Sequence, residues 1–183
     1  MSRPIMLLPH GTAPAGIPTP WVRIGRQGAN LHMTFRLPGD TRRVRVPAPI
    51  EPLVKRSEKR RADRLWEHTC FECFVRLAGA HDYFEFNFTP SQQWAAYRFD
   101  SYRAGMRHAD VAPPAIVSTP WPNRLELSAA VELPEWGDRP WLVNLAAVIE
   151  DMDGRTSYWA LAHPPGKPDF HHPACFALEV PAA

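Results

Sequence analysis

Long hydrophobic runs are missing from this 183-residue sequence. No apolar stretch approaches the roughly 18 residues that a membrane-spanning helix needs. The first ten residues hold too short an apolar stretch for a secretory signal. We therefore expect a cytoplasmic protein that does not insert into a membrane.

Cysteine is also scarce. An odd number of three cysteines, without a secretory signal, predicts reduced thiols rather than a disulfide framework. Cys70 and Cys73 form a C-x-x-C pair, but no second pair accompanies them as in a typical zinc site. The pair lies in a predicted strand, where residues three apart point to opposite faces. We predict that Cys70, Cys73 and Cys175 are ordinary buried thiols.

No strong excess of one charge is present, since the net charge is +2. Lys55–Arg64 holds six basic and two acidic residues, which leaves 15 basic and 17 acidic residues elsewhere, a net charge of −2. The basic charge is therefore local. Because no aromatic stacking platform adjoins this run, we read it as a solvated loop and expect no nucleic-acid partner.

Common catalytic motifs are absent. The sequence has no nucleophile elbow, no P-loop, no dinucleotide-binding glycine motif and no H-E-x-x-H. An enzyme that uses Glu72 with His68 or His163 as acid and base groups stays an open alternative.

Proline, by contrast, is abundant, with 21 residues in a chain that is 45% hydrophobic. Proline ends helices and is confined to the edges and turns of sheets, so we expect short elements and many loops. The length favours one domain over residues 1–183. Within it, residues 1–20 form a predicted irregular lead-in and residues 47–64 a predicted basic loop.

Alternation of side chains is the main positive signal. In Tyr83–Phe88, three phenylalanines occupy one face, whereas Tyr83, Glu85 and Asn87 occupy the other. Similar patterns predict about ten short strands and no long helix, which favours an all-β antiparallel β-sandwich or barrel. The predicted strands are Trp21–Arg26, Asn30–Leu37, Arg42–Val46, Thr69–Leu77, Tyr83–Phe88, Trp94–Asp100, Asn123–Val131, Trp141–Glu150, Thr156–Leu161 and Cys175–Val180.

Four segments carry a family resemblance. Leu65–Val75 reads Leu-Trp-Glu-His-Thr-Cys-Phe-Glu-Cys-Phe-Val, and Tyr83–Phe99 follows in the same order as in the family; Glu150–Pro164 and Lys167–His172 match its C-terminal end. The sequence resembles bacterial DOMON-like proteins related to family 9 carbohydrate-binding modules. This resemblance implies a jelly-roll-like β-sandwich that binds a sugar or another small ligand and, in some relatives, a haem.

The resemblance also implies site residues. In sugar-binding relatives two tryptophans sandwich a sugar ring, and Trp66 and Trp159 match those positions, while Glu72 matches a carboxylate position. Aromatic faces stack on the apolar face of a pyranose, and carboxylates accept bonds from hydroxyl groups. We therefore predict a non-catalytic domain that holds a saccharide or related polyhydroxy compound between Trp66 and Trp159. The alternative is that both are core tryptophans.

A row of polar residues on the predicted strands would form the floor of this site or, alternatively, a wet face of the sheet. It consists of Glu72, Glu85, Asn87, Arg98 and Glu150. The complete candidate ligand-binding set is Trp66, His68, Glu72, Glu85, Asn87, Arg98, Glu150, Trp159, His163, Lys167 and Asp169.

No cofactor is expected, but two alternatives stay open. Haem would need an axial methionine and histidine, for which the candidates are Met33, Met106, His108 and His163. A divalent metal could use His163, Asp169, His171 and His172, although neighbouring His171 and His172 would point apart in an extended chain.

Overall fold

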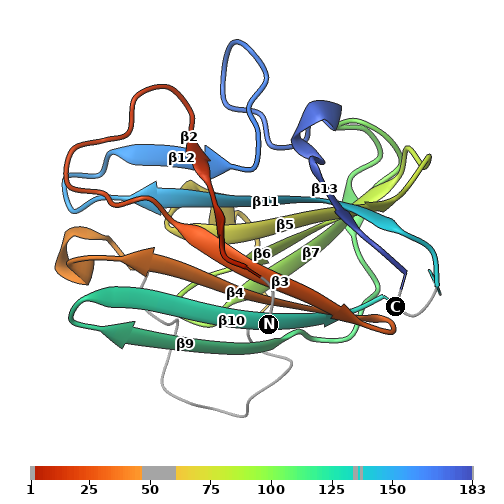
Figure 1. The fold of residues 1–183 in the computed structure, drawn as a ribbon, viewed down its shortest axis with the longest axis horizontal. Helices are drawn as coiled ribbons and strands as arrows, with labels where there is room; N and C mark the ends of the chain where they lie inside the picture. The colour runs from red at the N-terminus through yellow and green to blue at the C-terminus, as the bar shows by residue number, and fades with distance from the viewer. Residues whose placement is uncertain (1–2, 47–60, 134–135, 137, 183) are drawn as a thin grey trace.

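Two antiparallel sheets pack face to face in the computed structural model, which describes residues 3–46, 61–133, 136 and 138–182 (Figure 1). The all-β antiparallel sandwich predicted from the alternation is confirmed. The part of the basic run that lies in residues 55–60 falls outside the described residues. No helix among the described residues is long and apolar enough to cross a membrane.

The smaller sheet has the strand order β1-β3-β4-β10-β9. Its strands are β1 (Ile5–Met6), β3 (Trp21–Gln27), β4 (Asn30–Pro38), β10 (Arg124–Glu132) and β9 (Ala115–Trp121). In β4 and β10 buried and more exposed residues alternate strictly, because one face packs against the other sheet and the other meets solvent.

The larger sheet has the order β2-β12-β11-β5-β6-β7-β8, and β13 pairs with one end of β11. Its strands are β2 (Leu8–Pro9), β12 (Thr156–Ala160), β11 (Trp141–Glu150), β5 (Cys70–Leu77), β6 (Tyr83–Phe88), β7 (Trp94–Phe99), β8 (Arg107–His108) and β13 (Leu178–Val180). Short 3-10 helices in the connections include η1 (Thr41–Arg43), η2 (Leu65–Glu67) and η4 (Pro173–Cys175).

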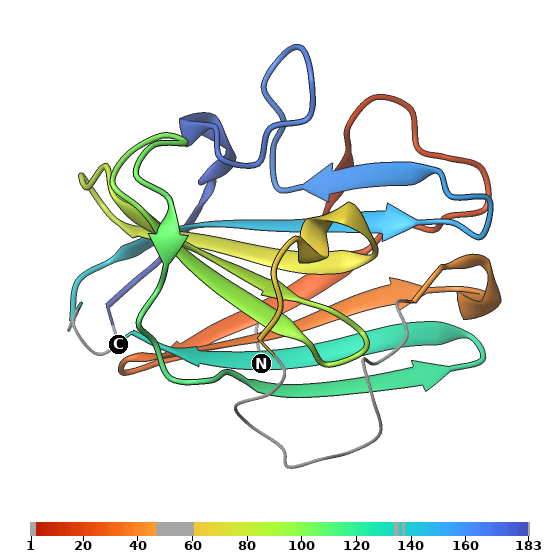
Figure 2. The same ribbon diagram turned by 180° about the vertical axis from the view of Figure 1, so that it is seen from behind.

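Both faces of the central strands of the larger sheet, β11, β5, β6 and β7, are mostly buried. Its inner face joins the core between the sheets, where the ring of Phe35 from β4 stacks on that of Phe71 from β5 with centroids 5.1 Å apart. Its outer face carries a second apolar cluster, which includes Leu65 from η2 and Phe170 and Phe176 from the C-terminal segment. Figure 2 shows η2 crossing in front of this sheet. The polar row on the outer face is therefore covered by other parts of the chain rather than open to water.

One predicted strand is wrong and another is shorter than predicted. Arg42–Val46 begins instead with η1, because the side chain of Asp40 accepts a bond from the backbone N–H of Arg42 and caps a 3-10 turn. In Cys175–Val180 the strand is limited to β13, since Pro173 begins η4 just before it. The lead-in also contains two very short strands, β1 and β2, that pair with β3 and β12.

The two cysteines of the C-x-x-C pair point to opposite faces of β5, as predicted. Cys70 belongs to the outer cluster and Cys73 to the core between the sheets. All three cysteines, Cys175 included, are unpaired and buried. Burial raises the pKa of each thiol, in the case of Cys175 to about 11.

Candidate functional site

A cavity of about 360 Å³ lies on the outer face of the larger sheet. Its volume is within the range of about 300–1,000 Å³ that is usual for small-molecule sites. The lining combines aromatic rings with two acidic side chains and one arginine. The lining residues are Trp66, Glu72, Glu85, Phe99, Arg103, Met106, Val148, Tyr158, Pro168, Phe170 and His171.

The cavity is explained by a row of small residues across the sheet. The register pairs Ala160 with Ala146, Ala146 with Glu72, Glu72 with Asn87, and Asn87 with Ala95. The three alanines of this row have no side chain beyond Cβ, so they leave space above the sheet beside Glu72. The larger rings of the neighbouring rows and loops form the walls.

Glu72 and Glu85 form the acidic floor of the cavity. Their exposed fractions are 2% and 4%, and they are diagonal neighbours on β5 and β6. Glu85 Oε1 accepts a 2.7 Å hydrogen bond from Asn87 Nδ2. Within the described part of the chain, Glu72 Oε1 is buried without a hydrogen-bond partner.

Burial changes the acidity of both carboxyl groups. It raises the pKa of Glu85 to about 7, against the lowering effect of the bond from Asn87. Burial and the nearby charge of Glu85 raise the pKa of Glu72 well above its ordinary value. Around neutral pH the two carboxyl groups of the floor are therefore not both ionised.

The segment that carries η2 places Trp66 over the sheet. Arg61 donates hydrogen bonds to the carbonyls of Ala96 and Ala109, at 2.8 and 2.9 Å. Tyr97 Oη donates to Asp63 at 2.6 Å. These bonds hold the start of the segment on β7, and the ring of Trp66 meets that of Tyr97 edge-on, with centroids 5.7 Å apart.

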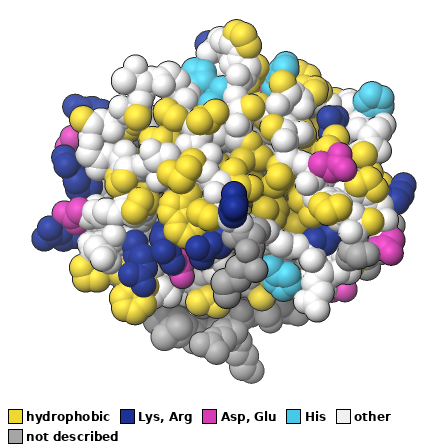
Figure 3. All heavy atoms as spheres, in the orientation of Figure 1, with side chains coloured by type: hydrophobic (Ala, Val, Ile, Leu, Met, Phe, Trp, Pro, Cys, Tyr) yellow, Lys and Arg dark blue, Asp and Glu magenta, His cyan; other side chains and the backbone are white. Residues whose placement is uncertain are grey.

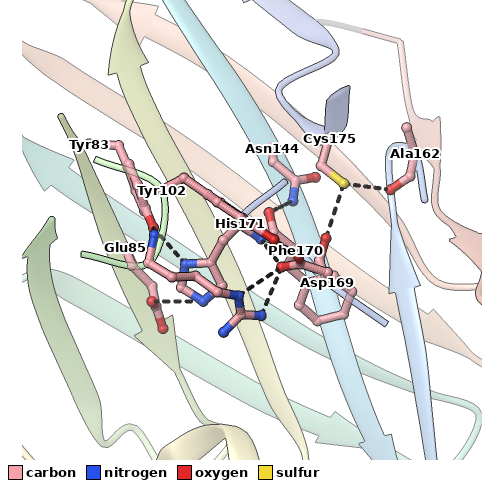
Figure 4. A network of polar contacts seen from close by, with 10 residues as sticks. Tyr83, Glu85, Tyr102, Asn144, Ala162, Asp169, Phe170, His171 and Cys175 are labelled. Atoms are coloured by element: carbon pink, nitrogen blue, oxygen red, sulfur yellow. Dashed lines mark hydrogen bonds and ion pairs between the residues drawn. The ribbon is translucent and has the colours of Figure 1, made fainter. Parts of the chain in front are cut away.

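The C-terminal segment forms the opposite wall and is fixed by buried polar bonds (Figure 4). Asn144 Nδ2 donates to the carbonyl of Phe170 at 2.9 Å. The thiol of Cys175 donates to the carbonyls of Ala162 and Asp169, at 3.1 and 3.3 Å. Phe170 and His171 are thereby held over the sheet.

His171 bridges this wall and the floor. Its Nδ1 lies 2.8 Å from Tyr83 Oη, and its Nε2 lies 3.7 Å from Glu85 Oε2 (Figure 4). Burial, with a smaller effect of Arg103, lowers the pKa of His171 to about 4. The imidazole is therefore neutral at pH 7 and supplies no positive charge to the floor.

The rim is made by the loop after β7 and the C-terminal segment. Arg103 Nη2 lies 2.7 Å from Asp169 Oδ1, and Tyr102 Oη also donates to Asp169. A more open depression adjoins the cavity here, and Lys167, Asp169 and His172 are among the residues that line it. Of the candidate ligand-binding residues, Lys167 and Asp169 lie at this depression.

Trp159 is not a wall of the cavity, so the predicted pairing of Trp66 with Trp159 around a ligand is wrong. The side chain of Trp159 has an exposed fraction of 0% and belongs to the core between the sheets. Its Nε1 donates a 3.0 Å bond to Ser157. Since side chains alternate along β12, Tyr158 occupies the outer face and lines the cavity with Trp66.

Arg98 also lies on the other side of the sheet from the cavity. The register places it opposite Phe84, an inward residue, and its guanidinium stacks 5.1 Å from that ring and pairs with Asp82. The prediction that Arg98 belongs to the polar floor is wrong, because alternation along β7 gives Tyr97 and Phe99 the outer face.

Four further candidates lie near the cavity but not on its lining. Asn87 is buried beneath it, bonded to Glu85. Glu150 shares the outer face but lies at the end of β11, where its carboxylate binds His68 Nδ1 at 2.7 Å and Arg45 at 3.3 Å. His163 Nε2 is bonded to the carbonyl of Leu8 at 2.8 Å.

Comparison with known proteins shows which solved structures share this fold. No protein-family model matches the chain, and no curated protein is similar enough in sequence to count as a match. A candidate carbohydrate-binding protein from Bacteroides uniformis has a similar structure, with a TM-score of 0.62 at 16% identity over 86% of this chain and 76% of that one. The chain shares the fold of this protein.

A family 9 carbohydrate-binding module from Caldicellulosiruptor kristjanssonii, solved in complex with glucose, is also similar. Its TM-score is 0.52 at 10% identity, over 95% of this chain and 90% of that one. The β-sandwich expected from the resemblance to family 9 modules is confirmed at the level of the fold.

The four residues considered as axial haem ligands lie in different parts of the structure. Of the four axial candidates only Met106 lines the cavity, while Met33 is buried between the sheets and His108 lies 3.6 Å from Asp63. His171, the histidine that does line the cavity, has its two ring nitrogens directed at Tyr83 and Glu85.

The residues considered for an enzyme or a metal site are also dispersed. Neither His68 nor His163 lines the cavity with Glu72; His68 pairs with Glu150, and His163 bonds to the carbonyl of Leu8. Among residues 3–46, 61–133, 136 and 138–182, no three His, Cys, Asp or Glu side chains are grouped so as to hold a metal ion. His171 lines the cavity and His172 instead caps η4, so the two neighbours do point apart.

Sequence reasoning missed several lining residues, notably Tyr158, Phe170, His171 and Arg103. Tyr158 was available from the alternation along Thr156–Leu161, since it must face away from Trp159. The other three lie in irregular segments that have no periodicity, and only their tertiary contacts bring them to the sheet.

Proposed function

We propose that this protein binds a monosaccharide-sized polyhydroxy ligand in the cavity on the outer face of the larger sheet, without catalysing a reaction on it. The observation that carries the proposal is the buried Oε1 of Glu72, which has no hydrogen-bond partner among the described residues and lies in a cavity with aromatic walls. A buried acceptor without a partner is unfavourable, and a ligand hydroxyl would satisfy it.

The walls suit a sugar ring. The rings of Trp66, Tyr158 and Phe170 offer apolar surfaces against which the C–H groups of a pyranose can pack. Glu72 and Glu85 supply oxygens from below, and Arg103 supplies N–H donors at the rim. The likeness of the fold to a module that was solved with glucose supports the same class of ligand.

The finer assignment rests on the quoted segments. We propose that the chain is related to the DOMON-like proteins, on the strength of Leu65–Val75 and Tyr83–Phe99, and that it acts in the cytoplasm. Its function there would be to hold a small sugar rather than to anchor an enzyme on a polysaccharide.

Isothermal calorimetry with a panel of free monosaccharides and disaccharides tests the proposal. We expect at least one monosaccharide to bind wild-type protein, and Trp66→Ala to lose that binding while keeping the β-sheet circular-dichroism spectrum. Arg98→Gln is the matched control, because Arg98 lies on the opposite face of the sheet and should leave affinity unchanged. Absence of binding across the panel, or equal losses in both variants, would contradict the proposal.

A further inference from the structure

Among the residues that the structure describes, the acidic floor of the cavity has no cation bonded to it. Among the described residues, the cationic side chain that lines the cavity is Arg103, and it is paired with Asp169 at the rim. His171 faces Glu85 but is neutral at pH 7. Within the described chain, two buried carboxyl groups therefore lie close together without a positively charged partner.

Other basic groups near this face have different partners. Arg45 and His68 bind Glu150 at the end of β11. Arg61 donates to two backbone carbonyls. Glu150 has two basic partners, whereas Glu72 Oε1 has no hydrogen-bond partner within the described chain. This contrast indicates that Glu72 is available to bind a cationic group that enters the cavity.

Physical chemistry limits what can satisfy such a floor. A buried carboxylate without a partner is strongly disfavoured, so the group either keeps a proton or pairs with a cation. Glu72 and Glu85 are diagonal neighbours on one face, and a single small cation could reach both. A primary ammonium carries three N–H donors, which suits one oxygen from each carboxylate and leaves a further donor.

We propose that the ligand is an amino sugar, whose primary ammonium group pairs with Glu72 and Glu85 while its ring packs between Trp66 and Tyr158. This inference rests on the proposed function and specifies its ligand class. The aromatic walls strengthen it, because the faces of aromatic rings attract cations as well as covering the C–H surface of the sugar.

A metal ion is a poorer match to the same floor. No third acidic, histidine or cysteine side chain joins the two glutamates in a cluster that could hold a metal, as far as the described residues extend. The apolar rings around the floor would also give a hydrated divalent ion few oxygen ligands.

Binding of an ammonium group should release proton from the floor. At mildly acidic pH the carboxyl pair is partly protonated, and an incoming cation favours its ionised form. The titratable and charged groups that face the pair come from every packed element. Among the described residues they are Cys70 from β5, Tyr83 from β6, Tyr97 from β7, Arg103 from the loop after β7 and His171 from the C-terminal segment.

Matched sugars provide the experiment. Calorimetry compares D-glucose, D-glucosamine and N-acetyl-D-glucosamine, together with the corresponding galactose and mannose series, so that each set differs only in one substituent. We expect wild-type protein to bind at least one amino sugar about tenfold or more tightly than both its hydroxyl and its N-acetyl counterparts, because a charge-assisted bond replaces a neutral one. The measured enthalpy should also vary with the ionisation enthalpy of the buffer, as proton release requires.

Three variants assign the preference to the floor. Glu72→Gln keeps the shape of the side chain and removes its charge, so the preference for the amino sugar should fall to near unity. Glu85→Gln tests the same floor independently should Glu72→Gln not fold. Glu150→Gln is the matched control, a buried glutamate on the same face that does not line the cavity, and it should keep the preference.

The outcomes separate this inference from the proposed function. Binding of neutral sugars as tight as that of their amino counterparts would overturn the amino-sugar inference and leave the proposed function standing. A preference that survives both floor variants would also overturn it, as would thermal stabilisation by Ca²⁺ alone that is lost in Glu72→Gln. Failure of every neutral and amino sugar to bind would contradict both proposals.

Discussion

Tyr158 and Trp159 are neighbours in the sequence and lie on opposite sides of the larger sheet. Tyr158 lines the cavity of the outer face, while Trp159 is enclosed in the core between the sheets. Two adjacent aromatic residues of β12 therefore have different surroundings, since one lines a cavity and the other packs in the core.

This difference predicts opposite effects of two tryptophan truncations. Trp159→Ala should lower the free energy of unfolding by about 3–5 kcal/mol, as is usual for a large core side chain. Trp66→Ala should cost much less stability, because its ring is only partly buried, and should instead weaken sugar binding. Urea unfolding and calorimetry on both variants measure the two effects. A larger loss of stability in Trp66→Ala than in Trp159→Ala would contradict the assignment.

Glu85 contributes a fall of stability with rising pH, which His171 opposes over most of the same interval. Glu85 titrates at 4.5 in an unfolded chain and at about 7 in the folded protein. Between these values Glu85 binds more proton in the folded state than in the unfolded state, so its contribution to the free energy of unfolding should decrease as pH rises, by at most about 1.4 kcal/mol per pH unit for one proton. In Glu85→Gln this decrease should be smaller. Urea midpoints measured across this pH range provide the check, and an unchanged slope would count against it.

His171 predicts the opposite trend on the acid side. It titrates at 6.5 when unfolded and at about 4 when folded. Over this interval the unfolded state binds more protons, so the contribution of His171 to stability is complete above about 6.5 and is lost as pH falls towards 4. His171→Gln should therefore show a weaker loss of stability in acid than wild type. The same urea titrations, compared with those of Glu85→Gln, separate the two opposing contributions.

The buried thiols predict protection from alkylation. Burial raises the pKa of Cys70, Cys73 and Cys175, so few thiolates are available in the native protein. Mass spectrometry should find slow labelling of the native protein by iodoacetamide and three labels after unfolding in urea. Prior treatment with a reductant should not change the three labels, whereas a gain of two labels on reduction would reveal a disulfide.

The contacts of Asp169 at the rim predict that its substitution weakens sugar binding more than it lowers the stability of the fold. Asp169 connects the loop after β7 to the C-terminal segment through Arg103 and Tyr102. Although burial opposes it, hydrogen bonds from these residues lower the pKa of Asp169, which is therefore ionised at neutral pH. Asp169→Asn should loosen the rim and reduce sugar affinity several-fold, with a loss of stability of about 1–2 kcal/mol. Asp153→Asn, at an exposed ion pair with Arg155, is the control and should change neither quantity measurably.

The sequence by itself determined the sheet class and much of the strand layout. Strict alternation in Tyr83–Phe88 and the long apolar run of Trp141–Glu150 predict strands with the bounds that β6 and β11 have in the structure. This works because alternation is a local property, which each strand shows regardless of its partners. Alternation also predicts correctly that Cys70 and Cys73 lie on opposite faces of their strand.

Tertiary structure decided which face holds the site. The central strands of the larger sheet are buried on both sides, so hydrophobicity does not distinguish the core between the sheets from the outer cluster. For this reason the sequence predicts the wrong face for Trp159 and Arg98. The walls from Phe170, His171 and Arg103 depend on bonds between residues far apart in the chain, such as the one from Asn144 to the carbonyl of Phe170. Irregular segments have no periodicity of their own, and only the packing of the folded chain determines where their side chains lie.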